Sequence, residues 1–203
     1  MVNAFPLDYL HVVCLGVMKK LLRMWISGDT SSLMPSIVIN KISSKLLLVS
    51  SSQPSCFQRK IRPLSEFGYF KGTELRTFLL YAGPFVLKDC LPPEMYTNFL
   101  LLHVAITILC DKSKHKTHSN LAHGLILRFI ENFGEIYGNH NIIYNVHCLT
   151  HLVNDTKIFG CLDNFSAFEF ESFMSQIKRM LHKHNQPLPQ LYNRIQEMQI
   201  SGY

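Results

Sequence analysis

Two histidines in the segment NVHCLTHL have the spacing of a metal-binding pair, because His147 and His151 lie four positions apart. On a helix such positions face the same way, with Cβ atoms about 5–6 Å apart, so two imidazoles can reach one zinc ion. The HExxH pattern of zinc proteases requires a glutamate directly after the first histidine, and Cys148 stands there instead. A hydrolytic zinc site of that class is therefore disfavoured. Two helix histidines that form hydrogen bonds within the core are the alternative.

Two carboxylates occur in an aromatic stretch, SAFEFESFM, where Glu169 and Glu171 are separated by one residue. Residues two apart on a helix point about 200° apart, so at most one of them faces the core. A carboxylate in apolar surroundings must be paired, protonated or bound to a metal ion. The alternative is that both acids stabilise the N-terminus of a helix electrostatically.

An acid and an imidazole also open the apolar segment PLDYLHVVCLGVMKKLL, as Asp8 and His11. Aspartate is a favoured N-cap residue, so a helix beginning at or just after Asp8 explains this side chain without a metal ion. His11 fits a hydrogen-bonded core histidine. As metal ligands, the two residues need partners from elsewhere in the chain.

Basic residues are concentrated in two predicted loops. The formal net charge is +6 and the sequence pI is about 9.0, which favours a nucleic acid or an acidic partner. The first loop, QRKIRP, contains Arg59, Lys60 and Arg62, and the second, DKSKHKTH, contains Lys112, Lys114 and Lys116. Loop charges that are simply solvated, and cations that contact phosphates, are both open interpretations.

The composition is that of a globular intracellular protein. Hydrophobic residues make up 47% of the 203 residues and charged ones 17%, which excludes a disordered chain. None of the six cysteines forms a CxxC pair, so we expect reduced, mostly buried thiols. The longest apolar run, FLLLHVAITILC, is shorter than the roughly 20 residues that span a bilayer, and no signal peptide is expected. We expect no membrane association.

Helical periodicity dominates the chain and predicts a mainly α fold with less than a tenth of its residues in strands. The best strand candidates are the short runs NIIYNV and GYF. The helices are expected at residues 8–25, 37–49, 73–81, 85–90, 94–110, 120–137, 146–156, 169–184 and 187–200.

Several short motifs occur one after another along the chain. They are D-x-x-H with V-x-L-G-V-x-K-x-L-L, R-K-x-R-P, K-G-T-E-L-R-x-F-L-L-Y-x-G-P, L-P-x-x-x-Y, N-V-H-x-L-x-H-L and F-G-x-L-x-x-F-S-A-F-x-F-E. In order and approximate spacing, this set resembles the catalytic region of CACTA (En/Spm-like) DNA transposases, above all the copies in animal genomes. The resemblance covers Pro6 to about Leu181.

The resemblance implies an RNase H-like nuclease core with a D-D-E triad that holds two Mg²⁺ ions. Asp8 matches the second aspartate, and His11 the histidine of its D-x-x-H signature. Glu171 matches the glutamate, with Glu169 as the second choice. Asp8 and Glu171 are then the expected catalytic and Mg²⁺-binding residues, and they are expected to lie close together.

The resemblance also implies that His147 and His151 help to bind a structural zinc ion. No CxxC completes such a site, and Cys56, Cys90 or Cys110 could do so only through the fold.

The first aspartate of the triad should lie ahead of Met1. We therefore expect a single domain, residues 1–203, that is the C-terminal part of an incomplete RNase H-like core. Residues 1–28 would form its first core helix, residues 29–140 a helical insertion, and residues 141–203 the histidine pair and the glutamate helix.

A DNA-strand-cleaving and strand-transfer enzyme of this class works on DNA in the nucleus, and the full-length enzyme is a candidate homo-oligomer. With the first aspartate missing, we expect weak Mg²⁺ binding and no strand cleavage by this chain alone. The alternative is a non-catalytic all-α module that binds DNA or protein.

Overall fold

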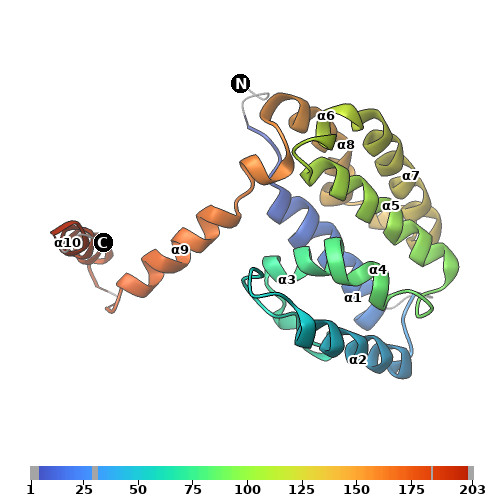
Figure 1. Cartoon of the computed structure of the whole chain (residues 1–203), viewed down its shortest axis with the longest axis horizontal. Coiled ribbons are helices and arrows are strands. Elements are labelled where there is room, and N and C mark those ends of the chain that lie inside the picture. The colour runs from blue at the N-terminus through green and yellow to red at the C-terminus, as the bar shows by residue number, and fades with distance from the viewer. Residues whose placement is uncertain (1–4, 29–31, 184, 201–203) are drawn as a thin grey trace. The chain divides into compact units, whose positions relative to one another are not determined.

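Helices make up all of the regular structure that a computed structural model describes, which covers residues 5–28, 32–183 and 185–200 (Figure 1). They account for 77% of these residues, and no strand occurs among them, so the predicted mainly α fold is confirmed. The sheet of an RNase H-like core is thus missing from the described ranges, and that part of the expectation is not supported.

The bounds of the helices agree with the predicted ranges to within a few residues at most ends. The α-helices are α1 (Lys19–Ser27), α2 (Ser36–Ser52), α3 (Gly72–Thr77), α4 (Gly83–Val86), α5 (Pro93–Cys110), α6 (Lys114–Thr117), α7 (Ser119–Tyr137), α8 (Tyr144–Phe159), α9 (Phe168–Met180) and α10 (Pro187–Ile200). Two π-helical segments, η2 (Leu10–Met18) and η4 (Phe78–Ala82), and three 3₁₀ segments, η3 (Leu64–Tyr69), η5 (Asn139–Asn141) and η6 (Leu162–Phe165), complete the set.

Both strand candidates were wrong. The run NIIYNV enters α8 at Tyr144, and GYF lies at the end of η3, with Phe70 as its C-cap residue. Each run is short and apolar, and such runs do not distinguish a strand from a buried helical turn. The basic loop after α5 was also not expected to contain a helix, yet α6 forms there.

The chain divides into two compact units, Met1–Ser166 and Ala167–Tyr203, and the first contains the hydrophobic core. Within it, η2 packs against α3 and α8, and α5 lies along α7 (Figure 1). The fully buried Trp25 of α1 meets Phe99 of α5 edge-on, with ring centroids 6.3 Å apart. The indole Nε1 donates a hydrogen bond to the Tyr137 hydroxyl of α7, at 3.0 Å. One aromatic cluster therefore joins three helices.

By length and composition alone, α5 could cross a membrane, because its 18 residues have a mean hydropathy of 1.3. In the structure it is a core helix that buries eight side chains, and it packs along α7. A core helix of a soluble protein meets the same criteria, so this observation is weak evidence for a membrane span.

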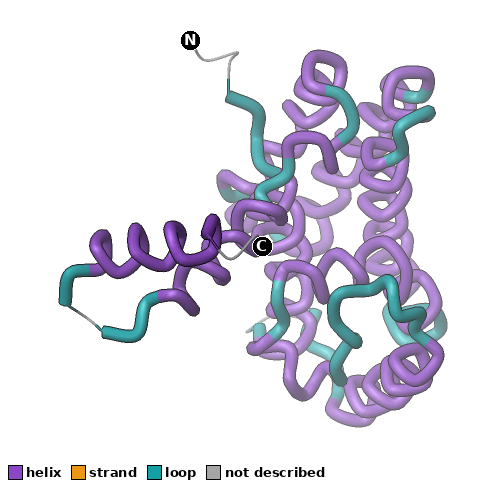
Figure 2. Tube along the Cα trace, turned by 60° about the vertical axis from the view of Figure 1, so that its left-hand side comes forward, coloured by secondary structure: helices purple, strands orange, loops and turns teal. Residues whose placement is uncertain are grey.

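The second unit consists of α9, α10 and the turn between them (Figure 2). The side chain of Gln190 organises this turn. Its Oε1 accepts hydrogen bonds from the backbone N–H groups of His182 and Lys183, both at 3.1 Å, and its Nε2 donates to the carbonyl of Asn185 at 2.6 Å. No residue described in α9 or α10 is buried.

Candidate functional site

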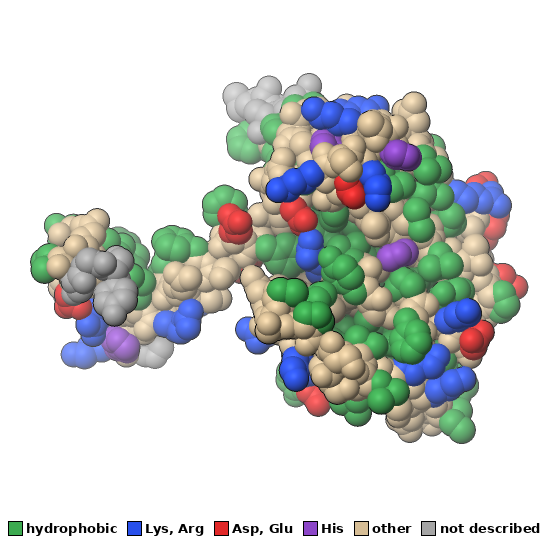
Figure 3. Space-filling model, in the orientation of Figure 1, with side chains coloured by type: hydrophobic (Ala, Val, Ile, Leu, Met, Phe, Trp, Pro, Cys, Tyr) green, Lys and Arg blue, Asp and Glu red, His purple; other side chains and the backbone are tan. Residues whose placement is uncertain are grey.

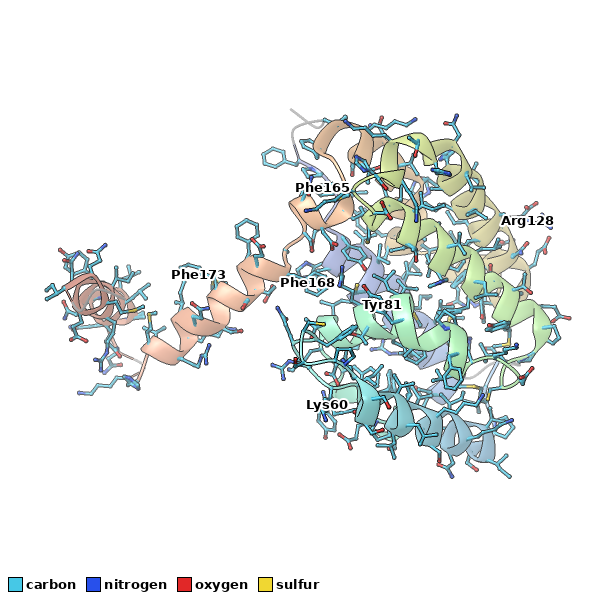
Figure 4. The ribbon with its side chains drawn as sticks, viewed as in Figure 1. Lys60, Tyr81, Arg128, Phe165, Phe168 and Phe173 are labelled. Carbon is cyan, nitrogen blue, oxygen red and sulfur yellow. The ribbon has the colours of Figure 1, made fainter. Side chains whose placement is uncertain are left out.

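An open cavity of about 540 Å³ lies on the first unit, where the QRKIRP loop meets the start of α3. It is lined by Arg59, Lys60, Arg62, Tyr69, Lys71 and Glu74. Four of the six side chains are cationic and one is a carboxylate, which gives the lining a net formal charge of +3. Figure 4 shows Lys60 at the outer edge of the unit. The cavity is therefore a candidate site for an anion.

An ion pair forms the inner wall of this cavity. Arg62 Nε and Nη2 each lie 2.8 Å from one carboxylate oxygen of Glu74, whose side chain is only 1% exposed. The backbone N–H of Lys71 donates to Glu74 Oε2 at 2.9 Å, and Arg62 also donates to the Tyr69 carbonyl. Burial alone raises the pKa of Glu74. The hydrogen bonds from Arg62 and Lys71 outweigh it and hold the pKa below its ordinary 4.5.

The ion pair changes the roles expected for the basic residues. The charge of Arg62 is neutralised within the protein, whereas Arg59 and Lys60 are exposed. Lys71, which the sequence analysis did not single out, joins them as a third exposed cation of the lining. The cations available to a ligand at this cavity are thus Arg59, Lys60 and Lys71, and Lys71 takes the place that was predicted for Arg62.

The loop that presents Arg59 and Lys60 is held by side-chain hydrogen bonds. Gln53 Nε2 donates to the Arg59 carbonyl at 2.9 Å, and Gln53 Oε1 accepts from the Ile61 N–H at 3.0 Å. These two bonds close the loop over residues 54–60. The loop therefore has a defined conformation, in which the exposed cations need not be ordered from a random chain when they bind.

We expect Glu74→Gln to lower the free energy of unfolding by about 1–3 kcal/mol at pH 7, because a charged partner of Arg62 is replaced by a neutral amide. A carboxyl whose folded pKa is depressed stabilises the fold above its unfolded pKa, and this contribution is lost as the pH falls through the folded value. The difference in the free energy of unfolding between wild type and variant should accordingly reach its maximum above pH 4.5 and become smaller below it. Urea unfolding at pH 7 and pH 3 measures both values. A difference that grows at pH 3 would contradict the assignment.

The second basic cluster consists of Lys112, Lys114 and Lys116. It lies on and just before α6, at the other end of the first unit (Figures 1 and 3). Lys114 Nζ lies 3.3 Å from Asp111 Oδ2, and Lys112 and Lys116 are exposed. Hydrogen bonds from the hydroxyl and backbone N–H of Ser113 hold the pKa of Asp111 well below its usual range. This cluster lies on a capped helical turn, and a contact of its lysines with phosphates stays a prediction.

Asp8 acts as a helix cap. Its carboxylate accepts hydrogen bonds from the backbone N–H groups of Leu10 at 3.2 Å and His11 at 3.0 Å, and it also contacts His11 Nδ1. Next to it, the Leu7 N–H donates to Asp155 Oδ2 of α8 at 2.9 Å, which ties the start of η2 to that helix. The cap predicted for Asp8 is therefore present, and its role as a metal ligand stays a prediction.

His147 and His151 lie on one exposed face of α8, with ring centroids 5.5 Å apart. They are surface residues and not the core histidines of the alternative interpretation. Across the part of the chain that the structure describes, no group of three or more His, Cys, Asp and Glu side chains could hold a metal ion. A structural zinc ion takes four ligands, so the pair supplies half of such a site.

Glu169 and Glu171 both lie in the first turn of α9, where acidic side chains stabilise a helix N-terminus, and both are exposed. They belong to the second unit, whereas Asp8 belongs to the first. The expected closeness of Asp8 and Glu171 joins the two units and stays a prediction. Among the described residues, Asp8 does not belong to any group of three or more His, Cys, Asp and Glu side chains that could hold a metal ion, and its binding of Mg²⁺ stays a prediction.

Two thiols of the first unit have raised pKa values. Cys14 is fully buried, and burial raises its pKa well above the ordinary value. Burial likewise raises the pKa of Cys110 to about 12. Both side chains are therefore held in the thiol form more strongly than an exposed cysteine.

Comparisons with known proteins identify no relative of this chain. A scan against models of protein families finds no match, and neither the search of curated proteins nor the search of solved structures returns one. The resemblance to CACTA transposases accordingly depends on the ordered motifs of the sequence.

Proposed function

We propose that this chain is a transposase-derived, DNA-binding helical segment that contacts backbone phosphates through the cavity at Arg59, Lys60 and Lys71. The observation that carries the proposal is the local charge: three exposed cations surround a wall whose arginine is already neutralised by Glu74. A phosphate that enters the cavity meets donors from two directions, the loop and the start of α3. Phosphate contacts of this kind supply most of the sequence-independent affinity for DNA.

Two further features support a nucleic acid as the ligand. Tyr69 lines the same cavity with its side chain 73% exposed, and an exposed aromatic ring beside cations can stack on a base. The ordered motifs resemble those of enzymes that act on DNA in the nucleus. We place the chain in that compartment on the resemblance alone.

We expect no DNA cleavage by these 203 residues alone. On the resemblance, Asp8 and Glu171 would be two of the three Mg²⁺-binding carboxylates of such an enzyme. Cleavage also requires the sheet that orders such carboxylates. We therefore expect no nicking of plasmid DNA with Mg²⁺, and metal-dependent nicking that Glu171→Ala abolishes would contradict this part of the proposal.

The binding test is the salt dependence of affinity for a fluorescent 20-bp duplex. Log affinity should fall linearly with log salt, with a slope of about −0.9 for each phosphate contact, or about −2.7 for three. The variant Arg59→Gln/Lys60→Gln/Lys71→Gln should lose most of that slope, together with roughly tenfold or more of the affinity at 50 mM salt.

A matched control separates the cavity from general attraction between a basic protein and DNA. Lys112→Gln/Lys114→Gln/Lys116→Gln removes the same formal charge at the other end of the first unit, and we expect it to keep most of the slope. Equal losses in both triple variants would show that net charge alone drives binding. Binding that is insensitive to salt would overturn the proposal outright.

A further inference from the structure

The basic cavity of the first unit is lined by an aromatic ring as well as by cations. The ring is that of Tyr69, which is 73% exposed. The Tyr69 carbonyl accepts a hydrogen bond from Arg62 Nη2, and the next residue, Phe70, is buried. Since Glu74 holds the same guanidinium, the ring stands on a segment that is already ordered. A flat ligand can therefore stack on Tyr69 without first ordering the backbone that carries it.

The size of the cavity limits which form of DNA can reach this ring. Its volume of about 540 Å³ lies within the roughly 300–1,000 Å³ of sites that enclose small molecules, and a single nucleotide is a ligand of that class. In a duplex the flat faces of the bases are stacked on one another. A side chain reaches such a face only after the nucleotide has been unpaired and flipped out, at a cost in free energy. The cavity therefore fits one nucleotide of an unpaired strand better than a base pair.

The cations of the cavity are complementary in charge to the phosphates of such a strand. Arg59 and Lys60 come from the loop and Lys71 from the residue before α3, so two segments of the chain contribute to one lining. Sites for single-stranded nucleic acids combine the same two components. Phosphates meet the cations, and bases stack on aromatic rings.

A second pair of rings lies close to the same loop. Phe57 comes two residues before Arg59 and meets Tyr81 of η4 edge-on, with ring centroids 5.2 Å apart. Tyr81, labelled in Figure 4, is 55% exposed. Two residues span at most about 7 Å, so a strand whose phosphate contacts Arg59 lies close to this aromatic pair. A neighbouring unpaired base then has a ring on which to stack.

We propose that the basic cavity binds single-stranded DNA in preference to duplex DNA, with an unpaired base stacked on Tyr69 and the flanking phosphates held by Arg59, Lys60 and Lys71. The inference rests on the proposed function, because it names the form of DNA that the same cavity takes. Every base has a π-face, so stacking of this kind tolerates any sequence. The cavity thus selects the form of the DNA and not its sequence.

The affinities of the full chain for a fluorescent single strand and for the duplex of the same sequence and length test the proposal. At low salt we expect the single strand to bind about fivefold more tightly or better, which is the lower end of what one stacked base contributes. The slope of log affinity against log salt should be about −2.1 for three phosphates of the single strand, against about −2.7 for three of the duplex. A strand of abasic nucleotides retains the phosphates, so it should retain the slope and lose the preference.

Variants of Tyr69 test the stacking directly. Tyr69→Ala should weaken binding of the single strand about fivefold or more and leave binding of the duplex unchanged. Tyr69→Phe retains the ring and should bind both forms like wild type. The matched control is Tyr144→Ala, which removes a tyrosine of α8 that is 70% exposed and does not line the cavity, and it should change neither affinity. Equal effects of Tyr69→Ala and Tyr144→Ala would overturn the proposal.

The two forms of DNA also separate this inference from the proposed function. Equal affinities for strand and duplex, with a salt slope that still depends on Arg59, Lys60 and Lys71, would overturn the preference and leave the phosphate contact in place. A slope that does not depend on these three cations would overturn both. An RNA strand of the same sequence that binds more tightly than the DNA strand would overturn DNA as the ligand.

Discussion

Trp25→Ala is expected to lower the free energy of unfolding by about 3–5 kcal/mol, the range for removing a large aromatic side chain from a packed core. The indole is fully buried where α1 meets α5 and α7, and its loss removes the contact with Phe99. It also leaves the Tyr137 hydroxyl, whose pKa burial already raises, without the indole N–H that donates to it. Chemical denaturation followed by circular dichroism measures the change.

Two control variants divide this loss into its parts. Trp25→Phe keeps an aromatic ring but removes the indole N–H, and Tyr137→Phe removes the acceptor and leaves the rings of the cluster in place. We expect each control to cost less than Trp25→Ala, because each one retains most of the buried area. A loss below about 1 kcal/mol for Trp25→Ala, typical of a surface substitution, would show that the cluster does not hold the three helices together.

Gly160→Ala is expected to cost about 2–4 kcal/mol, from backbone strain and from a steric clash that add to each other. Gly160 ends α8 with φ +92° and ψ −163°, a region that is essentially restricted to glycine. An added Cβ would lie 2.3 Å from Asn164 Nδ2. Asn164 accepts a hydrogen bond from the Cys161 thiol at 3.2 Å, so the clash would disturb the turn that leads to the second unit.

The matched control is Gly124→Ala in α7. Gly124 has nothing within 4 Å of an added Cβ, and alanine is the better helix former by roughly 0.5–1 kcal/mol, so this variant should be slightly more stable than wild type. The double variant Gly160→Ala/Asn164→Ala removes the clash and leaves the backbone strain. If Gly160→Ala and Gly124→Ala change stability in the same direction, the glycine at position 160 is not required by its conformation.

The sequence predicted the helices well because a 3.6-residue apolar period marks a buried helix face whatever it packs against. It did not predict the π-helical turns of η2 (Leu10–Met18), which packs against α3 and α8, because such turns are rare in proteins. The candidate strands failed for a related reason. In NIIYNV the β-branched residues suggest a strand, but the segment continues into the periodic pattern of α8.

The cavity was only partly predictable. Arg59 and Lys60 stand out as neighbours in a basic run, but Lys71 is an isolated lysine that joins them only through the fold. The pairing of the Arg62 charge could not be anticipated either, because its partner Glu74 is 12 residues away. The sequence predicts the charged loop. Only the structure shows that the buried Glu74 carboxylate pairs with Arg62 and leaves Arg59 and Lys60 available to a ligand.

The loop that Gln53 closes also contains Cys56, which is exposed, whereas Cys14, Cys148 and Cys161 are buried. At neutral pH a maleimide fluorophore should therefore modify Cys56 faster than these buried thiols, and replacing the partly exposed Cys90 and Cys110 by serine would make the labelling selective. The dye would sit three residues from Arg59, at the edge of the basic cavity. A native thiol thus gives this protein an optical reporter whose emission can follow the arrival of an anion at the cavity in real time.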